Sequence, residues 1–367
     1  MNKVGFGFLR LPVIAGSDPK QYDLSLLERL VDRFLELGGN YFDTAYTYPG
    51  SEEALRKTLV ERHPRSSFRI ANKLPGWKIG SYEQCQDYFD EQLRRCGVSY
   101  FDVYLLHDLN ERNYQTAQKA RQFRFIRELR EKGLVKAIGF SYHDGPELLD
   151  RILAEHPEVD YVQLQINYLD WENPAIQSAA CYETALRHGK KVLVMEPVKG
   201  GNLANIPEEA DRLLKGYYPD RSIPAWAIQF ASSLAQVEIV LSGMNTMAQI
   251  EDNLRQQDNM GQKEFFLLLQ AAQIIRSKTA IGCTGCAYCT DGCPQNIPIP
   301  GIFTLYNEYH RYPTELWKLQ GSYDKLTERA AASDCIECSQ CQLHCPQKLP
   351  VIQGLKEAAQ VFEKDKR

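Results

Sequence analysis

Eight of the eleven cysteines in this 367-residue chain fall into two runs with the same spacing, C-x2-C-x2-C-x3-C-P. The first run holds Cys283, Cys286, Cys289, Cys293 and Pro294, and the second holds Cys335, Cys338, Cys341, Cys345 and Pro346. Thiolates are soft ligands that suit zinc or iron–sulfur clusters. Structural zinc commonly uses separated C-x2-C pairs. Three thiolates on one tight loop instead suit three corners of a cubane, with the fourth ligand supplied from elsewhere.

The double run resembles the bacterial-type ferredoxin domain with two clusters, over about residues 280–350. The resemblance implies that Cys283, Cys286, Cys289 and Cys345 hold one 4Fe-4S cluster, and that Cys335, Cys338, Cys341 and Cys293 hold the second. The 41 residues between Cys293 and Cys335 exceed the spacer of that fold. We expect this spacer to dock onto the rest of the chain through its aromatic residues, Phe303, Tyr306, Tyr309 and Trp317. Cubanes need reduced thiols, so we expect a cytoplasmic location.

A second set of reactive residues lies near the ends of β-rich runs in the first third of the chain: Asp43, Tyr48, Lys73 and His107. These types suit carbonyl reduction, because hydride addition to a C=O group leaves an oxygen that needs a proton. An ammonium beside a tyrosine favours its ionised form, so we expect Lys73 to make Tyr48 a better acid. Asp43 would offset the burial cost of Lys73, and His107 would orient the carbonyl oxygen.

Eight β-rich runs alternate with amphipathic helical runs over residues 1–260. The predicted strands are 4–9, 40–44, 68–74, 101–107, 135–141, 161–167, 191–197 and 237–243, and the predicted helices are 22–37, 51–62, 81–96, 117–132, 146–156, 174–188, 221–235 and 246–257. Eight alternations in about 250 residues predict a closed (β/α)8 TIM barrel, with its chemistry at the C-terminal ends of the strands. An open doubly wound sheet is the alternative, which the lack of a G-x-G-x-x-G after the first strand weakens.

The fold class is therefore α/β: a barrel over residues 1–262, followed by a small α+β dicluster ferredoxin-like domain with connecting helices over residues 263–367. Net charge of −4 and a pI near 6.0 give no basic surface for nucleic acid. No apolar run reaches the roughly 18 residues of a membrane-spanning helix. The three remaining cysteines, Cys85, Cys96 and Cys181, are predicted to be buried small hydrophobic residues.

The segments GFGFLRLP, DTAYTYPGSE, IANKL, YLLHD, GFSYHD and QLQINYLD, in this order, resemble the aldo-keto reductase family over residues 4–257. The resemblance implies a catalytic tetrad of Asp43, Tyr48, Lys73 and His107. It also implies that Ser141 and Gln165 hold a nicotinamide carboxamide, that Ser242 and Gly243 lie near the cofactor phosphates, and that Asn253 contacts the adenine.

Two positions depart from that family. Met195, followed by Glu196 and Pro197, replaces the aromatic residue that stacks under the nicotinamide. Gln249 replaces the arginine that pairs with the 2′-phosphate of NADP, and a phosphate without a bidentate partner is poorly held. NAD(P)H is thus the expected cofactor, without support for a preference for NADP, and a flavin is left open.

Together the two halves predict an oxidoreductase that reduces a small carbonyl compound or oxidises an alcohol, while two clusters exchange single electrons with an external carrier. The loops 108–118 and 197–220 are expected to set substrate specificity. The alternatives are a barrel that works alone beside structural or sensory clusters, and a non-catalytic barrel that serves as an electron-transfer or regulatory adaptor.

Overall fold

The computed structural model describes residues 3–17, 21–255, 260–311 and 316–363. The chain divides into two compact units. The first comprises residues 1–172, 177–197 and 224–260, and the second comprises residues 173–176, 198–223 and 261–367. The segment 198–223, which follows the seventh strand, therefore belongs with the cysteine-rich part of the chain.

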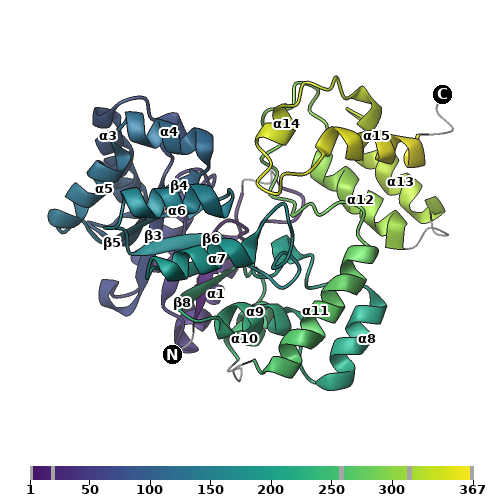
Figure 1. The fold of residues 1–367 in the computed structure, drawn as a ribbon, viewed down its shortest axis with the longest axis horizontal. Helices are drawn as coiled ribbons and strands as arrows, with labels where there is room; N and C mark the ends of the chain where they lie inside the picture. Colours follow the sequence, from purple (N-terminus) through teal and green to yellow (C-terminus); the bar gives the residue numbers. More distant parts are fainter. Residues whose placement is uncertain (1–2, 18–20, 256–259, 312–315, 364–367) are drawn as a thin grey trace. The chain divides into compact units, whose positions relative to one another are not determined.

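The first unit is built on eight parallel strands that close into a barrel in sequence order (Figure 1). They are β1 (Val4–Gly7), β2 (Tyr41–Asp43), β3 (Arg69–Leu74), β4 (Phe101–Leu109), β5 (Val135–Tyr142), β6 (Tyr161–Gln165), β7 (Lys191–Met195) and β8 (Val237–Ser242). Each strand lies within two residues of its predicted range. The closed order confirms the barrel and rules out the open sheet.

The helices of this part of the chain are α1 (Leu24–Glu36), α2 (Ser51–Leu55), α3 (Tyr82–Cys96), α4 (Glu111–Lys119), α5 (Gln122–Glu131), α6 (Pro146–Glu155), α7 (Ser178–Arg187), α9 (Ile223–Ser233) and α10 (Met247–Leu254). Two predicted ranges were wrong in extent. The range 51–62 ends in a π-helical turn, Arg56–Val60. The range 117–132 is two helices, because Arg121 adopts a φ of 52° between α4 and α5. Residues 256–257 of the last predicted helix lie outside the described residues.

The interior of the barrel is a packed apolar core. Side chains of a strand alternate between its two faces, so every second residue points inward. The inward residues Tyr41, Ala71, Val103, Leu105, Tyr161, Leu193, Ile239 and Leu241 form one buried cluster. This packing fills the lower part of the barrel and leaves the C-terminal strand ends to carry polar side chains.

The second unit consists of helices and irregular loops in its described residues. Its helices are α8 (Glu208–Tyr217), α11 (Gln262–Ser277), α12 (Ile299–Arg311), α13 (Leu316–Leu326), α14 (Gln340–Leu343) and α15 (Val351–Phe362). Helices α8 and α11 lie side by side (Figure 1). The strands expected of an α+β domain are not assigned within residues 261–311 and 316–363.

The aromatic spacer between the cysteine runs has a different role from the one expected. Phe303 and Tyr306 on α12 are buried in this unit's own core, together with Tyr323, Leu355 and Phe362, and Tyr309 packs against that core. The side chain of Trp317 lies outside the described part. The expectation that these aromatic residues cover another surface was wrong for Phe303 and Tyr306, because both are buried inside their own unit.

Within the described residues, the helices are each too short or too polar to cross a bilayer.

Candidate functional site

The strand periodicity that builds the barrel core also brings three of the predicted catalytic residues to one end. Asp43, Lys73 and His107 each come two residues after an inward core residue, namely Tyr41, Ala71 and Leu105. Asp43 pairs in register with Ala71, and Lys73 with Leu105. Because parallel strands end at the same rim, the three side chains converge at the C-terminal mouth.

Lys73 and Asp43 form a buried ion pair at this mouth. Lys73 Nζ donates to Asp43 Oδ1 at 2.5 Å and to the carbonyl oxygen of Thr44 at 2.9 Å. Gln163 Nε2 donates to the other carboxylate oxygen of Asp43 at 3.4 Å. Burial raises the pKa of Asp43 and lowers the pKa of Lys73, and each partner opposes the shift of the other. The lysine therefore has a fixed position, which its hydrogen bonds define.

Tyr48 follows β2 and lies over this pair. The Lys73 ammonium is 5.1 Å from the centroid of the Tyr48 ring, and the rings of Tyr48 and His107 meet edge-on with centroids 6.0 Å apart. Burial and, next, the Asp43 carboxylate raise the pKa of Tyr48 far above its ordinary value, while Arg10 acts in the opposite direction. Desolvation outweighs the opposing effect of Arg10, so the pKa of Tyr48 is raised in the free protein, and the expected acidifying effect of Lys73 stays a prediction.

His107 sits at an irregularity of β4. The β4–β5 register shifts between Leu106 and Leu109, and Asp108 adopts a φ of 57°. Such bulges re-aim a side chain next to active sites. Burial, then Lys73 and His143, lower the pKa of His107 well below 6.5, so its ring is neutral. Its Nδ1 lies 3.4 Å from Thr47 Oγ1.

The two predicted carboxamide ligands lie at the ends of neighbouring strands with their side chains engaged. Ser141 Oγ accepts from the backbone N–H of Asp108 at 2.7 Å, so it holds the bulge that presents His107. Gln165 Nε2 donates to the buried carboxylate of Asp170 at 2.9 Å. Gln165 pairs with Met195 in register, and the next residue, Glu196, adopts a φ of 54°.

The residues predicted to face the phosphates and adenine gather after β8. Asn253 on α10 donates through Nδ2 to Ser242 Oγ at 3.0 Å, and both side chains are buried. Gly243 is exposed, and a Cβ built on it would lie 3.6 Å from Arg10 Cβ. Gln249 has a structural role: its Oε1 accepts from the N–H groups of Asn245 and Thr246 and caps α10.

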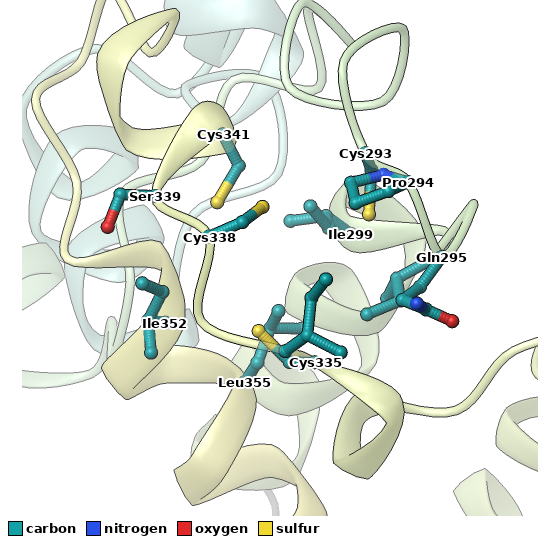
Figure 2. A pocket seen from close by; sticks show the side chains of 12 residues that line it. Cys293, Pro294, Gln295, Ile299, Cys335, Cys338, Ser339, Cys341, Ile352 and Leu355 are labelled. Atoms are coloured by element: carbon teal, nitrogen blue, oxygen red, sulfur yellow. The ribbon is translucent and has the colours of Figure 1, made fainter.

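The eight cysteines of the second unit surround two separate pockets. Cys335, Cys338 and Cys341 of the second run, with Cys293 of the first run, line a pocket with an empty volume of about 310 Å³. Figure 2 shows these four side chains arranged around it, with Ile299 and Leu355 beside them. The fourth cysteine thus comes from the other run.

The second pocket mirrors this arrangement. Cys283, Cys286 and Cys289 of the first run, with Cys345 of the second run, line an empty volume of about 330 Å³. Burial and the neighbouring thiols raise the pKa of Cys289 to about 12. Burial raises the pKa of Cys341 in the other set. Such thiols ionise only with a compensating cation, and a bound metal cluster provides that charge.

The arrangement of the cysteines fits a cluster better than one ion. Among the described residues, no three His, Cys, Asp or Glu side chains converge on a single metal ion. Each pocket instead collects three cysteines of one run and the fourth cysteine of the other run, as in two-cluster ferredoxins. The residues present therefore fit a cubane in each pocket.

Several contacts at these sites lack a signal in the sequence. Trp77, in a 3₁₀ turn after β3, packs its ring 5.3 Å from that of His107. Arg10 acts on Tyr48 from the segment after β1. Lys199 is buried, and it donates a hydrogen bond to Gln347, which lines the pocket of Cys345. The nearest available signal was the sequence KGGN at residues 199–202, where a lysine precedes two glycines.

The comparisons with known proteins match two successive parts of the chain to two different families. Residues 3–271 match the sequence profile of the aldo/keto reductase family. Residues 274–349 match that of the 4Fe-4S dicluster domain. An aldo-keto reductase from Mycolicibacterium smegmatis is 30% identical over 140 residues, which cover 37% of this chain and 49% of that protein. The chain thus spans about half the length of this curated relative.

Solved structures support the barrel. The holo form of an aldo-keto reductase from Bacillus halodurans superposes with a TM-score of 0.59 at 23% identity, over 73% of this chain and 91% of the other. An aldo-keto reductase from Klebsiella pneumoniae in complex with NADPH gives 0.58 at 16% identity, over 73% and 90%. Because the family profile matches residues 3–271, the chain belongs to the aldo/keto reductase family, with its barrel continued by a 4Fe-4S dicluster domain.

Proposed function

We propose that this protein is an oxidoreductase that reduces a small carbonyl compound, or oxidises the corresponding alcohol, at the mouth of its barrel. The observation that carries the proposal is the convergence of Tyr48, His107 and the Asp43–Lys73 pair, with the ammonium 5.1 Å from the tyrosine ring. A phenol, a neutral imidazole and a fixed ammonium are the groups that proton delivery to a carbonyl oxygen needs.

Tyr48 is the proposed proton donor. Its raised pKa keeps the hydroxyl protonated at neutral pH, as a donor must be. After it gives up its proton, the phenolate is stabilised by the Lys73 ammonium, which Asp43 and Thr44 hold in place. His107, neutral for the reasons given above, donates a hydrogen bond that orients the substrate oxygen.

The proposed cofactors are a nicotinamide in the barrel and two 4Fe-4S clusters in the cysteine pockets. When bound, the nicotinamide supplies the hydride and the clusters supply or accept single electrons. Ser141, Gln165 and Met195 would face the nicotinamide, and Ser242, Gly243 and Asn253 the remainder of the molecule. Gln249 is uncharged, and its side chain caps α10. It therefore offers no cation for a 2′-phosphate, and NADH and NADPH are both proposed.

The proposed cluster ligands are the two sets of cysteines that line the pockets. Cys283, Cys286, Cys289 and Cys345 would hold one cluster, and Cys293, Cys335, Cys338 and Cys341 the other. Each set takes its fourth member from the opposite run, which supports the crossed ligation of two-cluster ferredoxins. An external one-electron carrier is the proposed partner, and the reducing cytoplasm the proposed location.

The change of Tyr48 to Phe tests the catalytic proposal. We expect Tyr48→Phe to lower kcat/KM for carbonyl reduction by about 10²–10⁴-fold, because general acid catalysis contributes that much. The visible cluster absorbance should stay unchanged, since the substitution lies in the other unit. The measurement is anaerobic turnover with a panel of small aldehydes and ketones.

Tyr46→Phe is the matched control. Tyr46 lies two residues earlier, and its hydroxyl contacts Glu91 and Arg95 instead of the ion pair. Turnover by Tyr46→Phe should resemble that of the unmodified protein. Full turnover by Tyr48→Phe would rule out the proposed proton donor.

A further inference from the structure

We propose that residues 199–202, the loop after β7, form an outer shell around the cluster assigned to Cys283, Cys286, Cys289 and Cys345, and that Lys199 raises the reduction potential of this cluster. The inference rests on the cluster ligation proposed above. It concerns a segment that lies within the aldo/keto reductase match but belongs to the second compact unit.

Lys199 reaches two segments that supply ligands to the same pocket. Its side chain is 4% exposed, and Nζ donates to Gln347 Oε1 at 3.0 Å. Gln347 lines the pocket and lies two residues after Cys345. On the other side, Lys199 Cε would lie 3.8 Å from a Cβ built on Gly282, the residue before Cys283. The ammonium is thus placed one layer behind the cysteines.

The backbone of this loop is shaped to approach the first cysteine loop closely. Lys199, Gly200 and Gly201 adopt φ values of 47°, 65° and 102°. A Cβ on Gly200 would lie 2.2 Å from the carbonyl oxygen of Thr284, between Cys283 and Cys286. Asn202 Nδ2 donates to the carbonyl oxygen of Cys283 at 2.7 Å. A left-handed lysine persists only where its surroundings hold it, which these contacts do.

The charge of this shell is expected to act on the redox equilibrium. A reduced cluster carries one more negative charge than an oxidised one, so nearby positive charge and donated hydrogen bonds favour reduction. The backbone N–H of Gly285 adds a donor to Cys283 Sγ at 3.4 Å.

The linings of both pockets are uncharged, so the buried Lys199 brings a charge that neither lining supplies. Water screens an exposed charge far more than a buried one. We therefore expect Lys199 to make the Cys283 cluster easier to reduce.

The test is a redox titration of the anaerobic full-length protein, followed by electron paramagnetic resonance, with Lys199→Met, Lys199→Arg and Gln347→Leu. We expect Lys199→Met to make one of the two potentials more negative, by about 59 mV for each tenfold loss in the one-electron equilibrium constant. The other potential should stay in place. Lys199→Arg should restore at least part of the shift, and Gln347→Leu should move the same transition.

Lys215→Met is the matched control, because it removes a lysine from α8 in the same segment, where Lys215 pairs with Asp211 in solvent. It should leave both potentials unchanged. Unchanged potentials in Lys199→Met, with full iron content, would overturn the inference and leave the ligation standing. Zinc, or no iron, would instead overturn the ligation. Should Lys199→Met lose a cluster, unshifted potentials in Gln347→Leu would overturn the inference about Lys199.

Discussion

Protonation at the mouth of the barrel is governed by burial at the scale of single residues. Both Tyr48 and His107 are desolvated, and this stabilises the neutral form of each. The tyrosine keeps its proton, and the histidine stays uncharged beside the Lys73 ammonium. A protonated phenol and a neutral imidazole are the forms that reduction of a carbonyl requires.

This protonation pattern predicts the pH dependence of carbonyl reduction. The pKa of His107 is shifted below 6.5, so the neutral ring is present at and above that pH. The pKa of Tyr48 is shifted above 10.0, so the donor stays protonated at and below that pH. We therefore expect kcat/KM for carbonyl reduction to be constant between pH 6.5 and pH 10.0. A loss of activity with a midpoint near 6.5, absent from His107→Gln, would show that His107 titrates normally and contradict this assignment.

The tetrad was predictable because each member is near a strand end, and strand ends of a parallel barrel share one rim. The direction of the Tyr48 pKa was not predictable, since it depends on how deeply the phenol is buried. Trp77 and Arg10 were missed for a related reason. Their contacts depend on turns after β1 and β3, whose paths the strand pattern does not determine.

At the scale of secondary structure, the loop after β7 makes contacts that the sequence did not predict. It was expected to shape substrate specificity, together with residues 108–118. That expectation stays a prediction, and Gly200 and Asn202 in addition contact the Cys283 loop within the second unit. The close approach depends on glycine, because a side chain at position 200 meets backbone atoms.

Gly200→Ala is expected to remove one cluster. Its Cβ would overlap the Thr284 carbonyl, and the φ of 65° is strained for alanine. Iron content should fall from about eight atoms to about four, with the other cluster retained.

Gly216→Ala is the control for that substitution. Gly216 lies in α8, and a Cβ there meets nothing within 4 Å. This variant should keep all its iron and gain about 0.5–1 kcal/mol of stability from better helix propensity. Equal iron contents in both variants would contradict the contact with the Cys283 loop.

The eight strands were predictable because buried β-rich runs are bounded by clear helical periodicity. Helix α8 and most of helix α4 were missed, because residues 108–118 and 197–220 were taken as loops. The α4 sequence ERNYQTAQK is strongly polar, and only Asn113, Tyr114 and Ala117 are buried. A helix with so few apolar positions gives little periodic signal, and its formation depends on packing against the barrel.

At the scale of the whole molecule, one chain combines the site proposed for carbonyl reduction with two four-cysteine pockets. The two units have separate apolar cores, one inside the barrel and one around α12 and α15. The two crossed cysteine sets were implied by the resemblance to two-cluster ferredoxins, and the two pockets group the cysteines in the same way. The assignment of residues 198–223 to the second unit follows only from tertiary contacts.

The most direct test of the account is metal and sulfide analysis of the full-length protein purified without oxygen. The account predicts about eight iron atoms and about eight sulfides per chain, from two cubanes. Substitution of Cys345 by Ser should remove about four of the irons, although this residue belongs to the second run, because it serves the Cys283 pocket. Zinc in place of iron, or fewer than about four irons in the unmodified chain, would contradict it.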